Sequence, residues 1–85
     1  IENYASLRNQ LRELGYVFRT GTDTEVVAHL VAHHLEEELK LGANPTATQT
    51  YVKAVEGALR RLKGTYGLAV MFRDMPEMLI AARLG

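Results

Sequence analysis

A carboxylate at the expected start of a helix is the residue of this sequence best placed for chemistry. Residues 22–30 read Thr-Asp-Thr-Glu-Val-Val-Ala-His-Leu, so Thr22 stands three positions before Glu25 and directly before an apolar run. This spacing is typical of a capping box, in which the Thr hydroxyl and the Glu carboxylate each accept a hydrogen bond from a free backbone N–H. Asp23 then lies in the first turn, where a negative charge is favoured and can receive a cation such as a ligand ammonium group. The alternative interpretation is that Asp23 only helps to cap the helix.

Three further side chains on the same expected helix have the types and spacing of metal ligands. His29, His33 and Glu37 recur every four residues and therefore share one helix face. Two imidazoles and a carboxylate at this spacing can ligate zinc or nickel. No fourth ligand or supporting partner is evident, and the face lies opposite the apolar stripe, so we interpret these residues as solvent-exposed and expect no metal and no cofactor. His34 borders the stripe, which favours a partly buried packing role over that of a general base.

Three segments with the apolar period of a helix must position these side chains, and each ends at a glycine. Asn3 is expected to cap the first helix. Gly57, inside the third helix, is expected to let a neighbouring element approach closely. The expected helices cover residues 4–14, 23–41 and 47–63.

Two kinds of strand are expected between and after the helices. Residues 16–18 read as a short strand, and residues 68–72 and 78–82 are near-continuous apolar runs joined by the polar turn 73–77. The last two runs predict a hairpin of mostly buried strands. Together with the helices they predict the α/β (α+β) class, with a helix layer on an antiparallel sheet.

Composition limits the classes of function. The 85 residues suffice for one small domain, and the 10 Lys and Arg residues balance the 10 Asp and Glu residues, which argues against a general nucleic-acid surface. Arg8, Arg12 and Arg19 are most simply solvated charges. No apolar stretch approaches the roughly 18 residues of a membrane helix, and no signal peptide is visible. The sequence has no cysteine, which removes disulfides and fits a cytoplasmic location.

Several segments of the sequence resemble the class II glutamine amidotransferases, the N-terminal-nucleophile glutaminases that release ammonia from glutamine. The resemblance covers nearly the whole chain and is closer to the glucosamine-6-phosphate synthases than to the amidophosphoribosyltransferases, which usually carry Ser where Thr22 stands. The segments that carry it are residues 1–4 (Ile-Glu-Asn-Tyr), 22–26 (Thr-Asp-Thr-Glu-Val), 64–67 (Gly-Thr-Tyr-Gly) and 79–85 (Leu-Ile-Ala-Ala-Arg-Leu-Gly).

This resemblance implies a fold, a role for one residue and an incomplete site. The fold would be part of an αββα sandwich, and Asp23 would bind the α-amino group of glutamine. The family's nucleophilic cysteine is absent, and its Arg, His and oxyanion Asn-Gly pair would all precede residue 1. Residues 1–85 are therefore expected to form an internal part of one glutaminase domain, with no catalytic residue of their own and no activity alone.

The resemblance also implies partners. In the parent enzyme, ammonia from glutamine would pass to a sugar-phosphate isomerase domain that converts fructose 6-phosphate into glucosamine 6-phosphate. The expected partners are glutamine, the rest of the glutaminase domain and that isomerase domain, with no nucleic acid and no membrane. A homo-oligomer is also expected, because a piece of a sandwich leaves apolar strands uncovered. Two alternatives stay open: a non-catalytic assembly module, or the same segment of another class II amidotransferase such as an amidophosphoribosyltransferase.

Overall fold

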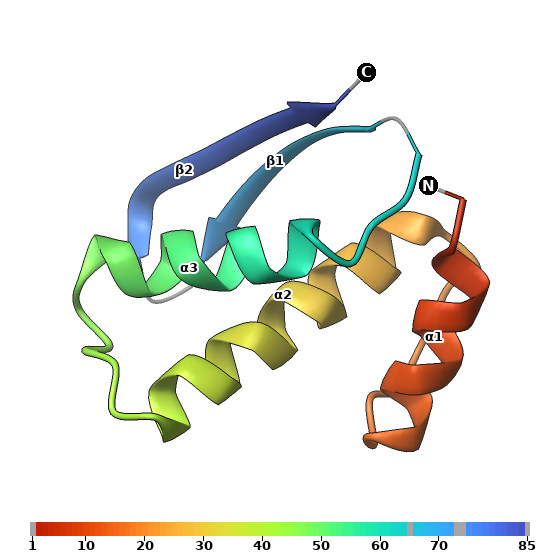
Figure 1. Cartoon of the computed structure of the whole chain (residues 1–85), viewed down its shortest axis with the longest axis horizontal. Helices are drawn as coiled ribbons and strands as arrows, with labels where there is room; N and C mark the ends of the chain where they lie inside the picture. Colours follow the sequence, from red (N-terminus) through yellow and green to blue (C-terminus); the bar gives the residue numbers. More distant parts are fainter. Residues whose placement is uncertain (1, 65, 73–74, 85) are drawn as a thin grey trace.

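The computed structural model of the chain describes residues 2–64, 66–72 and 75–84. Helices occupy the first part of the chain and two strands follow them (Figure 1). The elements are, in order, α1 (Tyr4–Glu13), α2 (Asp23–Lys40), α3 (Thr48–Leu59), β1 (Tyr66–Phe72) and β2 (Met75–Leu84).

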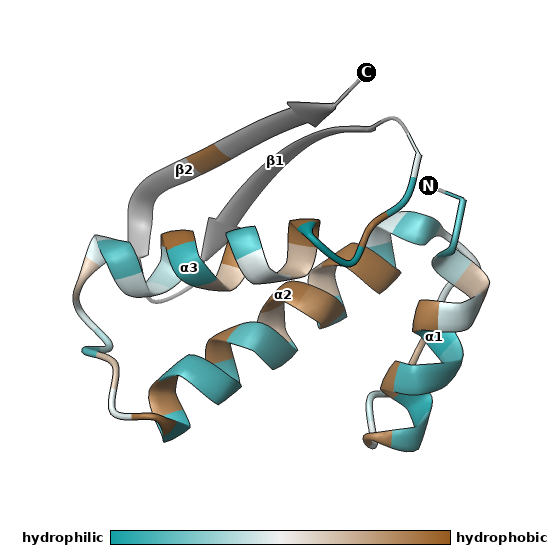
Figure 2. Ribbon diagram, viewed as in Figure 1, coloured by the Kyte–Doolittle hydropathy of each residue, from teal (hydrophilic) through white to brown (hydrophobic). Residues whose placement is uncertain are grey.

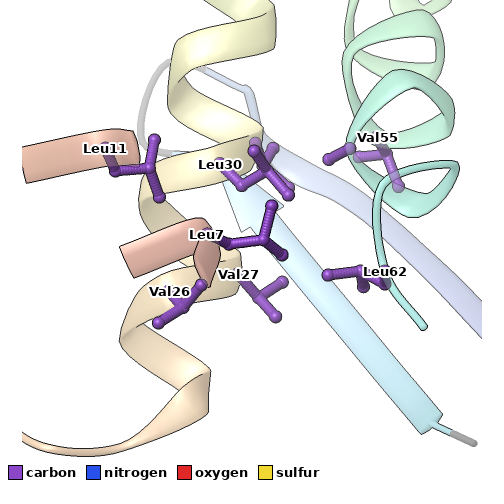
Figure 3. Close-up of a cluster of buried hydrophobic side chains, with 9 residues drawn as sticks. Leu7, Leu11, Val26, Val27, Leu30, Val55 and Leu62 are labelled. Atoms are coloured by element: carbon purple, nitrogen blue, oxygen red, sulfur yellow. The ribbon is translucent and has the colours of Figure 1, made fainter. Parts of the chain in front are cut away.

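The hydrophobic core lies between the three helices. Figure 3 shows labelled side chains of the three helices, and of Leu62 in the chain after α3, gathered in one cluster. In Figure 2 the apolar segments of α1 face α2, and its polar segments face away. Each helix therefore buries its stripe against another helix. The buried cluster consists of Leu7, Leu11, Val26, Val27, Leu30, Val31, Val55, Ala58 and Leu62.

The structure contradicts the expected α/β (α+β) fold class, with its helix layer on an antiparallel sheet and its place in an αββα sandwich. Among the described residues the strands are confined to one pair, β1 with β2, which lie antiparallel with Tyr66 opposite Leu84 and Met71 opposite Leu79. Ile80 of β2 is partly buried and packs against the buried cluster without belonging to it. Two strands form no sheet layer that organises the molecule, because the helices already bury their apolar stripes against each other.

The segment bounds differ from the expected ones mainly outside the first two helices. The expected strand at residues 16–18 is wrong, because these residues adopt no regular structure and Tyr16 and Phe18 instead pack against the core. The third helix ends at Leu59, earlier than residue 63. Of the expected turn 73–77, residues 75–77 belong to β2 and residues 73–74 lie outside the described residues.

Asn3 joins the start of α1 to the chain that follows α3. It occupies the N-cap position, but the expected capping bond is wrong, because its side chain makes no bond to the helix. The Asn3 Nδ2 amide instead donates to the Arg61 carbonyl at 2.7 Å, and its Oδ1 accepts from the Lys63 N–H at 2.9 Å. The Glu2 N–H donates to the Lys63 carbonyl at 2.7 Å. These bonds close the helical part of the chain on itself.

The helices in the described part of the chain include none that combines the length and the apolar character needed to cross a membrane.

Candidate functional site

Asp23 is the first residue of α2, as the sequence predicts. Thr22 precedes it at the N-cap with an extended backbone (φ −81°, ψ 149°), and the Asp23 side chain is half-buried. A carboxylate in this first turn is favoured by the positive end of the helix dipole. The position therefore suits the binding of a cationic group.

The expected capping box does not form. The Thr22 hydroxyl makes no capping bond to α2. The Glu25 carboxylate, instead of reaching the N-cap amide, accepts bonds from residues earlier in the chain. Its Oε2 lies 2.8 Å from the Arg19 N–H nitrogen, and its Oε1 lies 2.7 Å from both the amide nitrogen and the hydroxyl oxygen of Thr20. Glu25 thus fixes the chain before the helix rather than the helix end itself.

These bonds alter the acidity of Glu25. The backbone hydrogen bond from Arg19, followed by the hydroxyl bond from Thr20, lowers the pKa of Glu25 from 4.5 to about 2. Both bonds stabilise the charged carboxylate, which accounts for the direction of the shift. Glu25 is therefore an anion over the whole physiological range.

Arg8 of α1 binds the carbonyl groups of the same segment, the chain that precedes α2. Its guanidinium nitrogens donate to the Thr20 and Thr22 carbonyls at 3.0 and 3.1 Å, and its Cζ stands 5.1 Å from the centre of the Phe18 ring. The prediction that Arg8 is a simple solvated charge is wrong. In Figure 1 the connection from α1 runs back along α1 to the start of α2, which brings these groups together.

The face of α2 that carries His29, His33 and Glu37 is covered at its histidines and exposed at Glu37, as predicted for Glu37 alone. His29 Nε2 lies 3.1 Å from the Val17 carbonyl oxygen and 3.4 Å from Glu25 Oε2. The His29 ring also packs 4.7 Å from that of Phe18, centre to centre. The solvent-exposed interpretation of His29 is therefore wrong.

The expected metal-ligand spacing of His29, His33 and Glu37 does not produce a cluster. Within residues 2–64, 66–72 and 75–84, no three His, Asp or Glu side chains are grouped so that they could hold a metal ion. The expectation of no metal remains a prediction.

His34 is half-buried against α3, as the sequence predicts, and Gly57 permits this contact. A Cβ atom at Gly57 would lie 2.7 Å from His34 Nδ1, so the ring occupies the space left by the missing side chain. Burial, then the positive charges of Arg61 and His33, lower the pKa of His34 from its ordinary value. A cavity of about 460 Å³ opens beside it, with Glu38, Lys53 and Arg60 among its lining.

The sequence missed the roles of Glu25 and Arg8 around Asp23. Glu25 was recognised as a helix-start residue, but its bonding to Arg19 and Thr20 depends on how the preceding chain folds back. No sequence signal pairs Arg8 with carbonyls 12 and 14 positions away.

Comparison with known proteins identifies the family. The family of the glutamine amidotransferase domain matches residues 1–84, so the chain belongs to that family. Among its relatives are proteins named glutamine–fructose-6-phosphate aminotransferase (isomerizing). The one from Zymomonas mobilis is 44% identical over 85 residues, which is 100% of this chain and 12% of the relative. The one from Methanocaldococcus jannaschii is 43% identical over 83 residues, 98% of this chain and 7% of the relative.

A third relative of the same name, from Mesorhizobium japonicum, is 45% identical over the whole chain and 12% of its own length. The chain therefore spans only a small part of each of these relatives. No solved structure matches the chain. Family membership confirms the resemblance to the glutamine amidotransferases. The relatives' names agree with the closer resemblance to the glucosamine-6-phosphate synthases.

Proposed function

We propose that this chain forms the part of a glutaminase domain that binds the α-ammonium group of glutamine. The domain would supply ammonia for glucosamine 6-phosphate synthesis. The placement of Asp23 carries the proposal, because the half-buried carboxylate begins α2 within a segment that matches the amidotransferase family. The names of the relatives support glutamine and fructose 6-phosphate as the substrates of the whole enzyme.

Asp23 would bind the α-ammonium group of glutamine and so orient the carboxamide toward a nucleophile outside this chain. Binding of this kind contributes orientation rather than bond-making. Residues that attack the carboxamide and stabilise the oxyanion would come from the rest of the glutaminase domain. The chain alone would then release no glutamate from glutamine.

The same proposal includes the partners and the location of the enzyme. The chain would work with the remainder of the glutaminase domain and with a sugar-phosphate isomerase domain that uses the ammonia. It would belong to a homo-oligomer in the cytoplasm. Light scattering on the purified chain tests the oligomer: a monomer at micromolar concentration would contradict it.

A chimeric enzyme tests the function directly. The chain replaces the matching 85 residues of the Zymomonas mobilis relative, and glutamate release from glutamine is measured. We expect the chimera to hydrolyse glutamine and the isolated chain to show only background. In the chimera, Asp23→Asn removes the charge opposite the ammonium group, and losing one partner of such a pair costs about 2–5 kcal/mol. The expected loss in kcat/KM is therefore about 30-fold or more.

Glu56→Gln is the matched control. Among the ion pairs of the described residues, this exposed α3 carboxylate pairs only with Arg60, the residue after α3, at 3.8 Å. It should leave kcat/KM within about twofold, as exposed ion pairs contribute little. Circular dichroism must show that Asp23→Asn is folded, since Asp23 also supports the helix start. A folded chimera without glutaminase activity would contradict the proposal. So would an Asp23→Asn variant with unchanged kcat/KM, or a chimera that cannot fold around this segment.

A further inference from the structure

Two charged side chains bind the backbone just before α2, one through its N–H groups and the other through its carbonyls. Glu25 accepts the backbone N–H bonds of Arg19 and Thr20 at 2.8 and 2.7 Å. Arg8 donates to the carbonyls of Thr20 and Thr22 at 3.0 and 3.1 Å. One acidic side chain from α2 and one basic side chain from α1 therefore bind two amides and two carbonyls of residues 19–22.

These bonds reach the residue next to the candidate ligand-binding carboxylate. The Thr22 carbonyl that Arg8 binds belongs to the peptide unit joining Thr22 to Asp23. The plane of that unit fixes the N–Cα bond of Asp23, and the helical φ of this first residue of α2 then sets the direction of its Cα–Cβ bond. Glu25 adds a second constraint within the same helical turn, since its own backbone belongs to α2.

We propose that Glu25 and Arg8 are positioning residues that hold Asp23 in place for the ammonium group of glutamine. This inference rests on the proposed function. As positioning residues, neither Glu25 nor Arg8 contacts the substrate, and both act through the backbone of residues 19–22. Their effect depends on charge and geometry together: the carboxylate offers two acceptor oxygens, and the guanidinium forks onto two carbonyls.

Removing either side chain should weaken glutamine binding more than turnover. In Glu25→Gln one oxygen becomes an NH₂ group, which cannot accept the 2.8 Å bond from the Arg19 N–H, so this amide keeps only its longer bond of 3.1 Å to Oε1. In Arg8→Met the stem remains while both carbonyl bonds are lost. Misplacement of a positioning group by about 1 Å can cost up to about 100-fold. We expect each variant to raise the KM for glutamine about tenfold, on the order of one tenth of that limit, and to change kcat less.

The test uses the chimera that contains the whole chain and a double-mutant cycle with Asp23. In an Asp23→Asn background there is no carboxylate left to position, so adding Glu25→Gln or Arg8→Met should raise KM no further. Arg8→Lys keeps the charge but not the fork, and should lie between the parent chimera and Arg8→Met. A residue that merely stabilised the fold would show neither this coupling nor the selective change in KM.

The outcomes separate this inference from the proposed function. If Asp23→Asn raises the KM but Glu25→Gln and Arg8→Met leave it within about twofold, the positioning role is wrong and the ammonium site stands. Additive effects in the cycle would also overturn it. If Glu25→Gln fails to fold, Arg8→Met decides the question alone, because it removes no charge from α2. Failure of Asp23→Asn to change the KM contradicts the proposed function itself.

Discussion

The two connections between the helices begin alike and are held in different ways. The first connection, residues 14–22, and the second connection, residues 41–47, each contain a glycine with positive φ just after a helix: Gly15 at 98° and Gly42 at 93°. Only glycine adopts this conformation at little cost. Beyond that shared turn, the first connection folds back along α1, whereas the second leads directly into α3.

The groups that hold the second connection are neutral. Thr50 and Tyr51 of α3 are buried, and their hydroxyls donate to the carbonyls of Asn44 and Pro45 at 2.6 and 2.7 Å. Asn44 Oδ1 also accepts from the Thr46 N–H at 2.9 Å. Hydrogen bonds of this kind do not change over the ordinary range of pH.

The first connection is held instead by charges. The Glu25 carboxylate and the Arg8 guanidinium bind opposite polar groups of residues 19–22, and Asp23 follows directly. Charged groups therefore hold the connection that leads into Asp23, the residue for which we propose an ammonium-binding role. Neutral groups hold the connection that joins α2 to α3.

The largest effect on stability is expected where the two connections are alike. Gly15→Ala and Gly42→Ala place a Cβ in the left-handed region, which costs about 1–2 kcal/mol and is offset in part by a stiffer unfolded chain. Each should lower the free energy of unfolding by about 1 kcal/mol in urea titrations of the 85-residue chain.

Gly21→Ala is the matched control for these two changes. Its φ is not positive, and a Cβ there would meet nothing within 4 Å, so the free energy of unfolding should stay the same or rise slightly. If Gly21→Ala destabilised the chain as much as Gly15→Ala, backbone conformation would not be the shared feature of the two turns.

A second effect on stability, of comparable size, should separate the two connections. Thr50→Val keeps the shape of a side chain that is only 4% exposed but removes its bond to the Asn44 carbonyl. Loss of such a bond costs about 1 kcal/mol of unfolding free energy. In the chimera the same variant should leave the KM for glutamine unchanged, because the second connection lies at the other end of α2 from Asp23. A raised KM would show that the second connection also shapes the ligand site.

How far the sequence could predict this molecule depended on the range of the interactions. The helices of residues 4–13 and 23–40 followed from local periodicity and from the glycines that end them. Asp23 followed from its place beside Thr22. The family resemblance, together with the apolar runs of the last third, suggested a sheet-based architecture. The helices bury their stripes against one another, and no local pattern reveals that choice of partner.

The misses at the site have the same physical origin. Glu25 has the correct spacing for a capping box, yet the Arg19 and Thr20 amides compete for its carboxylate once the connection folds back. His29 has the spacing of a metal ligand, yet it packs beneath Phe18 and bonds to the Val17 carbonyl. In both cases a segment without periodicity determined the outcome, and its path is set by tertiary contacts.

The smallest expected effect is a difference in pH dependence between the two connections. The folded chain holds the pKa of Glu25 at about 2 instead of 4.5, so the unfolded chain binds the proton more readily between these values. The stabilisation is therefore fully present above pH 4.5 and is lost as the pH falls toward 2. Glu25→Gln cannot titrate, so its stability deficit relative to the parent chain should shrink over this window. The deficit of Thr50→Val should stay constant, because the Thr50 hydroxyl does not titrate in this range.

Urea unfolding of the parent chain and the two variants at several pH values between 2 and 6 measures both deficits. Because each deficit is a difference from the parent chain, the titration of the other carboxylates is subtracted. The effect is small because Glu25 is near the surface, where water and salt screen its charge. A Glu25→Gln deficit that does not change with pH would mean that shape rather than charge holds the first connection, and the contrast with the second connection would disappear.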